Sequence, residues 1–383
     1  MTSLFLTVVF SVFNIIVFAQ TLAIDKDKLF DLYQTQRYAE AGEYLKENYG
    51  ENTEDLKALT QMGYCFLMAG NNVEAEKYYL KANSLQADNL PILFNLASIN
   101  NRRGNTDKAK QYYGEIVKLD SNNFIVYKLL ANMYFSNKDS LKRVYLLKAN
   151  KLVPTDGDVA VDLAEVHALY QDNVKAYDVL NVAIKADNEN FVLQKAKLPI
   201  ANYLKKYDEV IVSGEALLKI GPDAAVIKDV AKAYYFTKKY DRAVALFTQL
   251  EKMQMQNENT LYYTTLCYRY LKNHKMAAVY AKKTIEEGIS PNIPNYYALL
   301  GLAYEENQQF SLANAAYKKG LFFDTNPTLY YRLAILYDTK LKQSKSARNY
   351  YQLYLKSKPN PKIDEQEIKF AQARIEQMDL LTK

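Results

Sequence analysis

Small side chains recur along the chain at nearly constant intervals, and larger apolar residues follow them at fixed offsets. Gly63, Ala97, Ala131 and Ala164 are separated by 34, 34 and 33 residues. Most of these positions have a second small residue twelve or thirteen positions later, as in the pairs Gly63 and Ala75, Ala97 and Ala109, Ala164 and Ala176, Ala231 and Ala243, Gly301 and Ala313, and Ala334 and Ala347. A leucine or an aromatic ring stands four residues after each second member. Self-similarity at this period predicts an array of stacked repeats.

The elements that this pattern predicts are long helices. The 383 residues contain only 12 glycines and 9 prolines, and the stretches between them are rich in Ala, Lys, Glu, Leu and Tyr. Few turn-forming residues favour long regular elements, and this composition favours helix. Small residues let one helix approach its neighbour closely, and aromatic rings fill the space that remains. We therefore expect most of the 34 tyrosines to be core residues.

The stretch 296–327 carries the pattern most clearly. The letters LGLAY begin at Leu300, and Ala313 precedes Tyr317 by four residues. This resembles the tetratricopeptide repeat, a unit of about 34 residues with W-x2-L-G-x2-Y, then A-x3-F and a proline. The resemblance covers about residues 22–360. It implies two antiparallel helices in each repeat, stacked into a solenoid because one repeat cannot bury its apolar face alone.

The fold that this resemblance implies is all-α: a right-handed α-solenoid of about ten helix-turn-helix repeats. We expect a degenerate first repeat at 20–55, repeats over 56–360 and one terminal helix at 361–383. The terminal segment is amphipathic and suits a helix that caps the stack. A helix that binds a partner is the alternative.

The repeats depart from the family pattern in several places. The tryptophan position holds Leu, Ile or Tyr, since the chain has no tryptophan. The repeats at 124–156 and 260–293 lack one residue, which we assign to the inner turn, and the repeat at 327–360 has one residue more. In the repeat at 191–223, Leu198 takes the small position and Pro199 follows it, which predicts a kinked or shortened first helix.

The first twenty residues differ from the rest of the chain. They contain no charged side chain, are apolar from Leu4 to Ala19, and end in Val17-Phe18-Ala19 before Gln20. This is typical of a secretory signal, here 1–19, that is cleaved after Ala19, although no Lys or Arg precedes the apolar run. A retained membrane anchor at 4–19 is the alternative. We therefore expect an exported protein, periplasmic or secreted, or one anchored by residues 4–19.

The charge is modest for this length. The formal net charge is +6 and the pI is about 8.8. Lys-Lys pairs at 205–206, 238–239, 282–283 and 318–319 are scattered, so we interpret them as solvated helix faces and expect no nucleic-acid partner. Cys65 and Cys267 fall in apolar helical patterns and are predicted to be buried thiols.

Groups that carry enzyme chemistry are scarce. His167 occupies an aromatic position of its repeat and is predicted to be a core residue, and His274 lies in a turn without a metal ligand at suitable spacing. The sequence contains no GxGxxG, GxxxxGK[ST], GxSxG or HExxH motif. We expect no catalytic residue, no metal and no cofactor, and predict that the chain is not an enzyme.

Function is then expected on the first helix of each repeat, which in this family lines the concave face and binds extended peptides or partner helices. Its outward positions are two, five, six, nine and twelve in the repeat. The candidate groove residues at these positions are Lys128, Asn132, Asp158, Asp162, Glu165, Lys228, Lys232, Tyr235, Tyr268, Glu305, Tyr331 and Arg332.

The charges of these candidates form two zones. Family members that clamp a carboxyl terminus use Lys and Asn, then Asn, then Lys and Arg, in three successive repeats. Lys128 and Asn132 match the first pair, but Asp162, Val192 and Ala196 break the rest, so we do not expect that ligand. An acidic strip at 158–165 and basic groups at 228–232 favour oriented recognition of a charged chain. Plain solvation of these residues is the alternative.

The function that follows is a non-enzymatic scaffold or adaptor that binds a protein or peptide in the bacterial cell envelope. This expectation rests on the resemblance to exported bacterial members of the family. One alternative is a periplasmic holdase for unfolded chains. Another is the substrate-recruiting subunit of a cell-wall or polysaccharide enzyme complex. The membrane is an expected partner only if the N-terminal segment is retained, and the pattern says nothing about oligomeric state.

Overall fold

The computed structural model describes residues 24–288 and 291–380. The predicted signal segment, with its alternative as an anchor at 4–19, lies outside these residues, as do positions 381–383. Among the described helices, none combines the length and the hydropathy that a membrane crossing requires.

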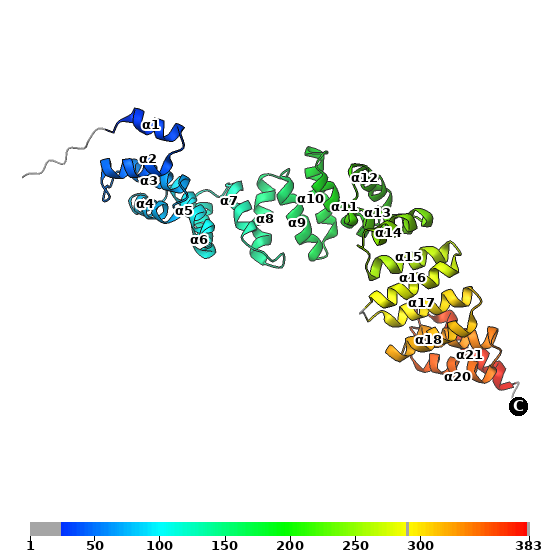
Figure 1. The fold of residues 1–383 in the computed structure, drawn as a ribbon. Coiled ribbons are helices and arrows are strands. Elements are labelled where there is room, and N and C mark those ends of the chain that lie inside the picture. Colours follow the sequence, from blue (N-terminus) through cyan, green and yellow to red (C-terminus); the bar gives the residue numbers. More distant parts are fainter. Residues whose placement is uncertain (1–23, 289–290, 381–383) are drawn as a thin grey trace, which may run out of the picture. The chain divides into compact units, whose positions relative to one another are not determined.

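The chain divides into two compact units, one ending at Val153 and one beginning at Pro154. In the described part of the N-terminal unit the helices form four pairs: α1 (Lys26–Gln34) with α2 (Tyr38–Tyr49), α3 (Leu56–Met68) with α4 (Asn72–Leu85), α5 (Leu90–Arg102) with α6 (Thr106–Leu119), and α7 (Phe124–Asn132) with α8 (Ser140–Leu152). Figure 1 shows these pairs in blue to cyan-green.

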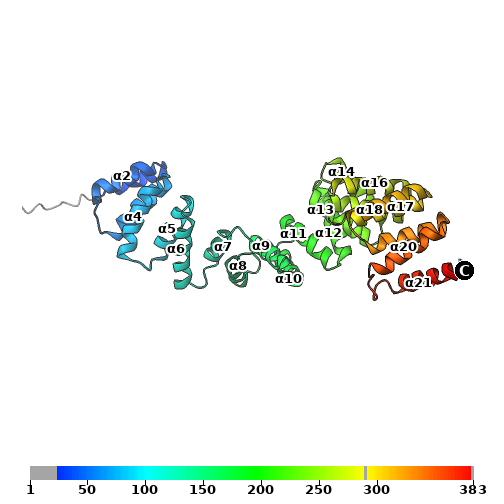
Figure 2. The ribbon, with the colours of Figure 1, turned by 90° about the horizontal axis from the view of Figure 1, so that it is seen from below.

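The C-terminal unit continues with six further pairs and a last helix. Its described helices are α9 (Gly157–Leu169), α10 (Asn173–Ala186), α11 (Phe191–Tyr203), α12 (Tyr207–Ile220), α13 (Ala224–Phe236), α14 (Tyr240–Lys252), α15 (Glu258–Tyr270), α16 (His274–Glu287), α17 (Ile293–Glu306), α18 (Phe310–Phe323), α19 (Pro327–Ile335), α20 (Ser344–Lys356) and α21 (Glu365–Leu380), with a π-helical turn η1 (Leu336–Lys340) after α19. Each pair is a hairpin of neighbouring helices (Figures 1 and 2). Ten hairpins and no strand among the described residues confirm the predicted all-α repeat fold.

Most hairpins close with the same three-residue inner turn. In the turn between α11 and α12, Lys205 has a φ of +60°. The amides of Lys205 and Lys206 donate hydrogen bonds to the carbonyls of Asn202 and Ala201. This closure satisfies carbonyl groups that the end of a helix otherwise leaves unpaired, so each first helix stops at a defined residue.

The small residues of the repeat are buried where helices approach each other, as predicted. A Cβ atom on Gly63 would lie 2.8 Å from the ring of Tyr79, sixteen residues later. Gly301 stands in the same relation to Tyr317, and a Cβ atom there would lie still closer to the ring. Both tyrosines are nearly inaccessible to solvent. The ring of the second helix therefore occupies the space that the missing side chain of the first helix leaves.

Two of the predicted irregularities are wrong in detail. In the repeat at 124–156 the first helix ends early, at Asn132, and the connection 133–139 is longer than a normal inner turn. In the repeat at 260–293 the inner turn 271–273 has the usual length, and α15 already begins at Glu258 after a longer outer connection, 253–257. Pro199 does not shorten α11, which has 13 residues like α9 and α13; a kink there stays a prediction.

The extra residue of the repeat at 327–360 is accommodated inside a helix. After Ile335 the chain widens into the π-turn η1, in which the amide of Leu341 donates to the carbonyl of Leu336, five residues back, at 3.0 Å. A π-turn adds one residue to a helix without breaking it. The register of Ala334 and Ala347 therefore survives, and both are fully buried.

The last helix packs against the last hairpin. Ala371 and Met378 of α21 are buried in the same core cluster as Tyr351 of α20. Asp338, in the π-turn, accepts hydrogen bonds from the Arg374 guanidinium at 2.6 and 2.8 Å and from the Tyr351 hydroxyl at 3.1 Å. The Arg374 hydrogen bonds hold the pKa of Asp338 below its ordinary value. The π-turn thus presents a carboxylate that fixes α21, consistent with a helix that caps the stack.

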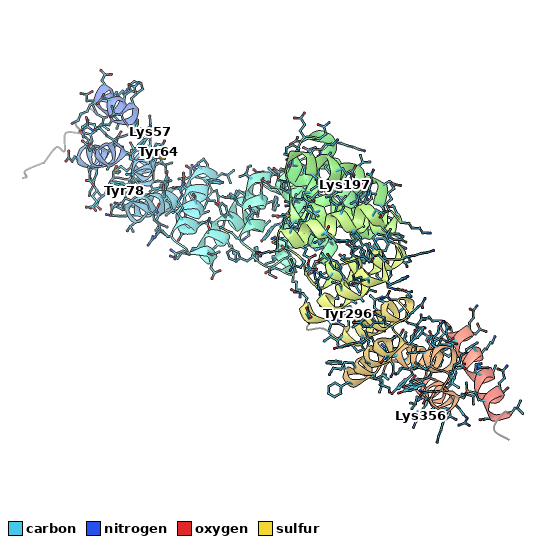
Figure 3. The ribbon with its side chains drawn as sticks, turned by 45° about the vertical axis from the view of Figure 1, so that its right-hand side comes forward. Lys57, Tyr64, Tyr78, Lys197, Tyr296 and Lys356 are labelled. Carbon is cyan, nitrogen blue, oxygen red and sulfur yellow. The ribbon has the colours of Figure 1, made fainter. Side chains whose placement is uncertain are left out.

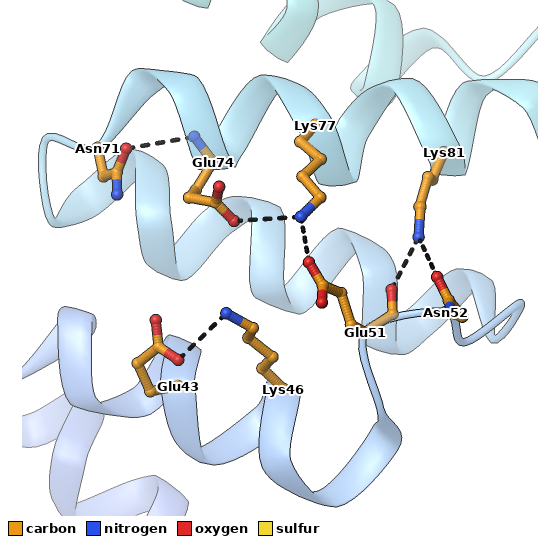
Figure 4. A network of polar contacts seen from close by, with 8 residues as sticks. All are labelled: Glu43, Lys46, Glu51, Asn52, Asn71, Glu74, Lys77 and Lys81. Atoms are coloured by element: carbon orange, nitrogen blue, oxygen red, sulfur yellow. Dashed lines mark hydrogen bonds and ion pairs between the residues drawn. The ribbon is translucent and has the colours of Figure 1, made fainter.

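A polar network ties the outer connection after α2 to α4 in the N-terminal unit (Figure 4). The Lys77 ammonium forms an ion pair with Glu51, and Lys81 donates to the carbonyl of Glu51 at 2.8 Å. These groups are partly exposed, and exposed ion pairs contribute at most about 1 kcal/mol each. The network therefore orients the connection, while burial of the small positions and rings stabilises the fold.

We predict opposite effects of alanine at two helical glycines. Gly301→Ala places a methyl group against Tyr317 and is expected to destabilise the C-terminal unit by roughly 1–3 kcal/mol, as overpacking does. Gly114→Ala, in α6, meets no atom within 4 Å and is expected to stabilise its helix by about 0.5–1 kcal/mol. Urea denaturation of both variants measures the difference. Equal shifts in one direction would contradict the packing of glycine against a ring.

A second prediction concerns the attachment of α21. Arg374→Ala leaves the Asp338 carboxylate, which is 8% exposed, without its cationic partner. The expected loss is roughly 2–3 kcal/mol, somewhat below that of a fully buried pair, with faster hydrogen exchange confined to α21 and its surroundings. Lys369→Ala removes an exposed ion pair of the same helix and should cost less than about 0.5 kcal/mol. Unchanged exchange in α21 of the Arg374 variant would contradict the proposed anchor.

Candidate protein-binding surfaces

The first helices of two consecutive repeats enclose a depression in the N-terminal unit. It has a volume of about 670 Å³ and lies between α3 and α5, with Lys57, Thr60, Pro91 and Asn95 on its walls and Tyr79 beside them. Lys57 and Tyr64, a half-exposed residue of the same helix, are labelled in Figure 3. The ammonium, the hydroxyl and the amide, together with Asp55 and Asn89 on the same partly apolar wall, can form hydrogen bonds with the backbone of a peptide.

The residues that line this depression were not among the candidates from the sequence, although their positions in the repeat indicated them. Lys57, Thr60, Pro91 and Asn95 stand at outward positions two, five, two and six of their repeats. The rule would have selected these four residues, but the candidates were taken only from later repeats, and the rule itself stays a prediction. What the rule does not supply is which pair of neighbouring helices leaves a depression between them, because that depends on the side chains of both.

The two candidates of the N-terminal unit lie on another helix. Lys128 and Asn132 belong to α7, and Asn132 is its exposed last residue. Neither lines the depression between α3 and α5. Their role in binding stays a prediction.

In the C-terminal unit the acidic and basic candidates lie on two first helices with a third between them. Asp158, Asp162 and Glu165 belong to α9, and Lys228 and Lys232 belong to α13. Helix α11 contacts both α9 and α13. Asp158, Glu165 and Lys228 are exposed, and the other two are half-buried. The predicted separation of charge is present, but its role in recognition stays a prediction.

Tyr235 and Tyr268 also pack between helices. The ring centroid of Tyr235 is 4.9 Å from that of Tyr263, and burial raises the pKa of Tyr235 above its ordinary value. Tyr268 stacks on Tyr280 with centroids 5.2 Å apart. These half-buried rings already contribute to packing within the unit, so a partner would meet their edges.

The last candidates lie near the terminal helix. Tyr331 and Arg332 line a cavity of about 90 Å³ together with Asp364 and Glu367, which flank and begin α21. Glu305 accepts a hydrogen bond from the buried Tyr317 hydroxyl at 3.0 Å. The terminal segment therefore covers part of the predicted groove surface at the last repeat.

A buried carboxylate lies within the basic zone. Asp229 follows Lys228 on α13. Its Oδ1 atom accepts a hydrogen bond from the side-chain amide group of Asn202 at 3.3 Å. Burial raises the pKa of Asp229 above its ordinary value, against the opposing effects of Lys228, the Asn202 hydrogen bond and Lys232. The Asn202 side-chain oxygen is buried without a hydrogen-bond partner. No sequence pattern indicated this pair, because it arises only where α11 meets α13.

Groups capable of enzyme chemistry occupy structural positions. Cys65 and Cys267 are buried, as predicted, and burial raises the pKa of the Cys267 thiol to about 12. His167 is buried in α9, as predicted, and His274 lies 3.1 Å from a carboxylate oxygen of Glu306. Within residues 24–288 and 291–380 no cluster of three or more His, Cys, Asp or Glu side chains has a geometry that could hold a metal.

Comparison with protein families identifies the repeats. A sequence model of the tetratricopeptide repeat matches residues 90–123 and 327–361. These ranges coincide with the hairpin of α5 and α6 and with that of α19 and α20. The chain therefore contains tetratricopeptide repeats.

Alignments with known proteins cover a part or most of the chain. Over 90 residues the chain is 33% identical to a UDP-N-acetylglucosamine--peptide N-acetylglucosaminyltransferase of Caenorhabditis elegans, a match that covers 24% of this chain and only 8% of that protein. A tetratricopeptide repeat protein from Parabacteroides merdae is 18% identical, with 63% of this chain and 96% of that chain covered and a TM-score of 0.40. Yeast Tom70 is 14% identical, with 92% and 95% covered and a TM-score of 0.40.

We predict that Asp229→Asn stabilises the protein at neutral pH. The pKa of Asp229 is higher in the folded protein than in the unfolded chain. Such a group lowers the stability of the folded protein as the pH rises from the ordinary pKa through the raised pKa. Asparagine removes this loss, and its amide group can donate to the unpaired Asn202 oxygen. The difference in urea midpoint between variant and parent should be positive at pH 7 and shrink toward pH 4 and below. A pH-independent difference would contradict the raised pKa.

Proposed function

We propose that this tetratricopeptide-repeat chain is a non-enzymatic scaffold or adaptor that binds a protein segment on the first-helix face of its hairpins. The observation that carries the proposal is the depression between α3 and α5, which places Lys57, Thr60 and Asn95 around one concave space. Pockets that combine apolar walls with a few polar groups are the usual sites of recognition. Repeat arrays use such extended surfaces to bind partners.

Absence of catalysis is part of this proposal. It is supported by the burial of both cysteines and by the ion-pair environment of His274, which lies beside Arg269 and Glu306. The transferase similarity covers 8% of that protein and supports only the repeats. Activity, if it accompanies this chain in a complex, would then reside on another subunit.

The cell envelope is the proposed location. The support is the apolar run from Leu4 to Ala19, which precedes the first described helix and ends in small residues at 17 and 19. Under this proposal the partner is an envelope protein. The holdase remains the alternative, since a holdase would capture many unfolded chains where an adaptor selects one partner.

We predict that crosslinks separate these two functions. A photo-reactive residue at Thr60 or at Asn95 should capture one and the same partner in intact cells, because both side chains face the depression. The same residue at Val73, an exposed position on the second helix α4, is the matched control and should capture it poorly. A ladder of many partners would favour the holdase, and capture from Val73 alone would contradict the first-helix surface.

Charge reversal tests the second candidate surface. The double variant Lys228→Glu, Lys232→Glu should bind the captured partner with an affinity at least about tenfold lower, or roughly 1.4 kcal/mol weaker. Its helical circular dichroism signal should stay unchanged. The matched control is Lys185→Glu with Lys219→Glu, which changes two exposed lysines on second helices by the same total charge. Equal binding by all three proteins would remove the basic zone from the proposed function.

A further inference from the structure

Three consecutive hairpins of the C-terminal unit close with nearly the same five letters. The segments are YLKKY at 203–207, FTKKY at 236–240 and YLKNH at 270–274. Each spans the inner turn of its hairpin, from the last residue of the first helix to the first residue of the second. The lysine pairs at 205–206 and 238–239 therefore lie at turns and not on helix faces, which corrects their interpretation in the sequence. We call the set Tyr203, Lys205, Lys206, Phe236, Lys238, Lys239, Tyr270 and Lys272 the inner-turn strip.

The aromatic members of the strip are exposed, and two of them stack on rings of the preceding hairpin. Tyr203, Phe236 and Tyr270 are 65%, 41% and 57% exposed. Tyr207 stacks on Phe236 of the next hairpin with ring centroids 5.0 Å apart, and Tyr240 stacks on Tyr270 in the same way at 4.6 Å. Stacking from one turn to the next holds the three turns in a row. Between the third turn and the next one, the place of such a stacked pair is taken by a polar contact between His274 and Glu306. The series of stacked rings therefore ends at the third turn.

Three lysines of the strip occupy the left-handed position of their inner turns. Lys205, Lys238 and Lys272 have φ values of +60°, +61° and +59°, a conformation that glycine tolerates best. Gly70 and Gly104 take the equivalent position in two other inner turns, and Gln36, Gln171, Gln308 and Lys342 take it in four more.

Lys206 and Lys239 are the N-cap residues of α12 and α14 and make no capping hydrogen bond. The equivalent Asp172 and Asn273 cap their helices with their side chains, whereas Arg37, Gln309 and Gln343 do not. A cation at this end of a helix is also opposed by the helix dipole. The Lys206 and Lys239 ammonium groups lie 4.6 Å and 5.8 Å from the ring centroids of Tyr177 and Tyr234, so both lysines contribute to packing as well as to the surface charge.

The charge of the strip is concentrated. The segments 203–209, 236–242 and 270–275 contain seven Lys or Arg and three Asp or Glu residues, a net charge of +4 in a chain whose total is +6. Glu209 is engaged with Lys197 and Tyr177, outside the strip. In the described part of the chain, Lys205, Lys238 and Lys272 are exposed and form no ion pair.

We propose that the inner-turn strip docks the protein on an anionic phospholipid surface. Lysine ammonium groups attract anionic headgroups, and exposed tyrosine and phenylalanine rings insert at the boundary between headgroups and acyl chains. A row of protruding turns can meet a flat surface at all three points at once. The depression proposed to bind a protein segment is lined by no member of the strip.

Single-stranded nucleic acid fits the strip less well. Base stacking needs a free aromatic face, and Phe236 and Tyr270 already stack nearly parallel on Tyr207 and Tyr240, with interplanar angles of 11° and 8°. The inference is independent of the partner proposed for the first-helix surface, because the strip lies at the inner-turn edge of the hairpins. It also does not require residues 4–19 to be retained.

Binding to vesicles tests the charges. The variant Lys205→Gln, Lys238→Gln, Lys272→Gln is suitable because Gln36, Gln171 and Gln308 occupy the same left-handed turn position elsewhere in the chain. At about 1 kcal/mol for each lysine, partition of the whole chain onto phosphatidylglycerol vesicles should fall roughly a hundredfold. Lys185→Gln, Lys219→Gln, Lys252→Gln removes the same charge at the opposite, outer-turn edge and should leave partition within about twofold. Equal loss in both variants would overturn the proposal.

A tryptophan probe locates the contact. The chain has no tryptophan, so Tyr203→Trp gives a single emitter on the strip and Ile220→Trp gives one at the outer-turn edge of the same hairpin. Phosphatidylglycerol vesicles should shift the emission of the Tyr203→Trp variant to shorter wavelength, and phosphatidylcholine vesicles should not. The Ile220→Trp variant should show no shift with either. The difference in emission shift between the two variants shows that the strip itself contacts the vesicle, even if residues 4–19 hold the protein on vesicles of both kinds.

A capping variant separates binding from stability. Lys239→Asn supplies a favourable N-cap and should raise Tm by about 2–4 °C while it weakens binding to anionic vesicles severalfold. A changed Tm with unchanged binding to anionic vesicles would show a purely structural role for Lys239 and would contradict its part in the strip. The parent protein could instead bind polyglutamate or single-stranded RNA with the same dependence on the three lysines. If the Tyr203→Trp variant then showed no emission shift on vesicles, the strip would be assigned to those partners.

Discussion

Two helices approach closely only where one of them lacks a bulky side chain, and the hairpins of this chain depend on that constraint. Gly63 and Gly301 leave the space that the rings of Tyr79 and Tyr317 fill, and alanine takes the same place beside Tyr113 and Phe247 in other repeats. Because each ring belongs to the second helix and each small residue to the first, the pair fixes both the distance between the helices and their register. Loss of either member leaves a cavity or an overlap in a core that is close-packed.

This constraint explains why irregularities are absorbed at the ends of helices and not at the small positions. The repeat at 327–360 places its extra residue in the π-turn η1, after Ala334 has made its contact. The repeat at 124–156 ends its first helix at Asn132, immediately after Ala131. In the repeat at 191–223 the bulky Leu198 holds the small position, and Gly214 of the second helix provides the space, with Leu198 and Val230 against it. Where one helix loses its small residue, its partner supplies one.

The repeat period of the sequence therefore predicts the fold, but the sequence predicts much less of the candidate sites. Positions such as Ala75 and Ala109 could be assigned because close packing restricts the residue type at a fixed place. Thr60 and Asn95 could be placed on the outward face, yet their common depression depends on how α3 and α5 are spaced. The pair of Asp229 and Asn202, 27 residues apart, and the π-turn depend on contacts between helices that no local pattern specifies. Solvent-facing positions tolerate many residues, so a single sequence marks them weakly.

The lysines of the inner turns show how such positions can still be recognised. Stability alone favours glycine at the left-handed residue and Asn, Asp or Ser at the N-cap. Some inner turns of this chain follow both preferences, as Gly70 and Asn71 do, while Gln36, Gln171 and Gln308 depart from the first. Lys205 and Lys206, and again Lys238 and Lys239, depart from both preferences at once, 33 residues apart. The same two turns present exposed rings whose stacking joins one hairpin to the next. Exposed lysines and rings that recur at three consecutive turns are most simply explained by one extended surface outside the protein that all three turns contact together.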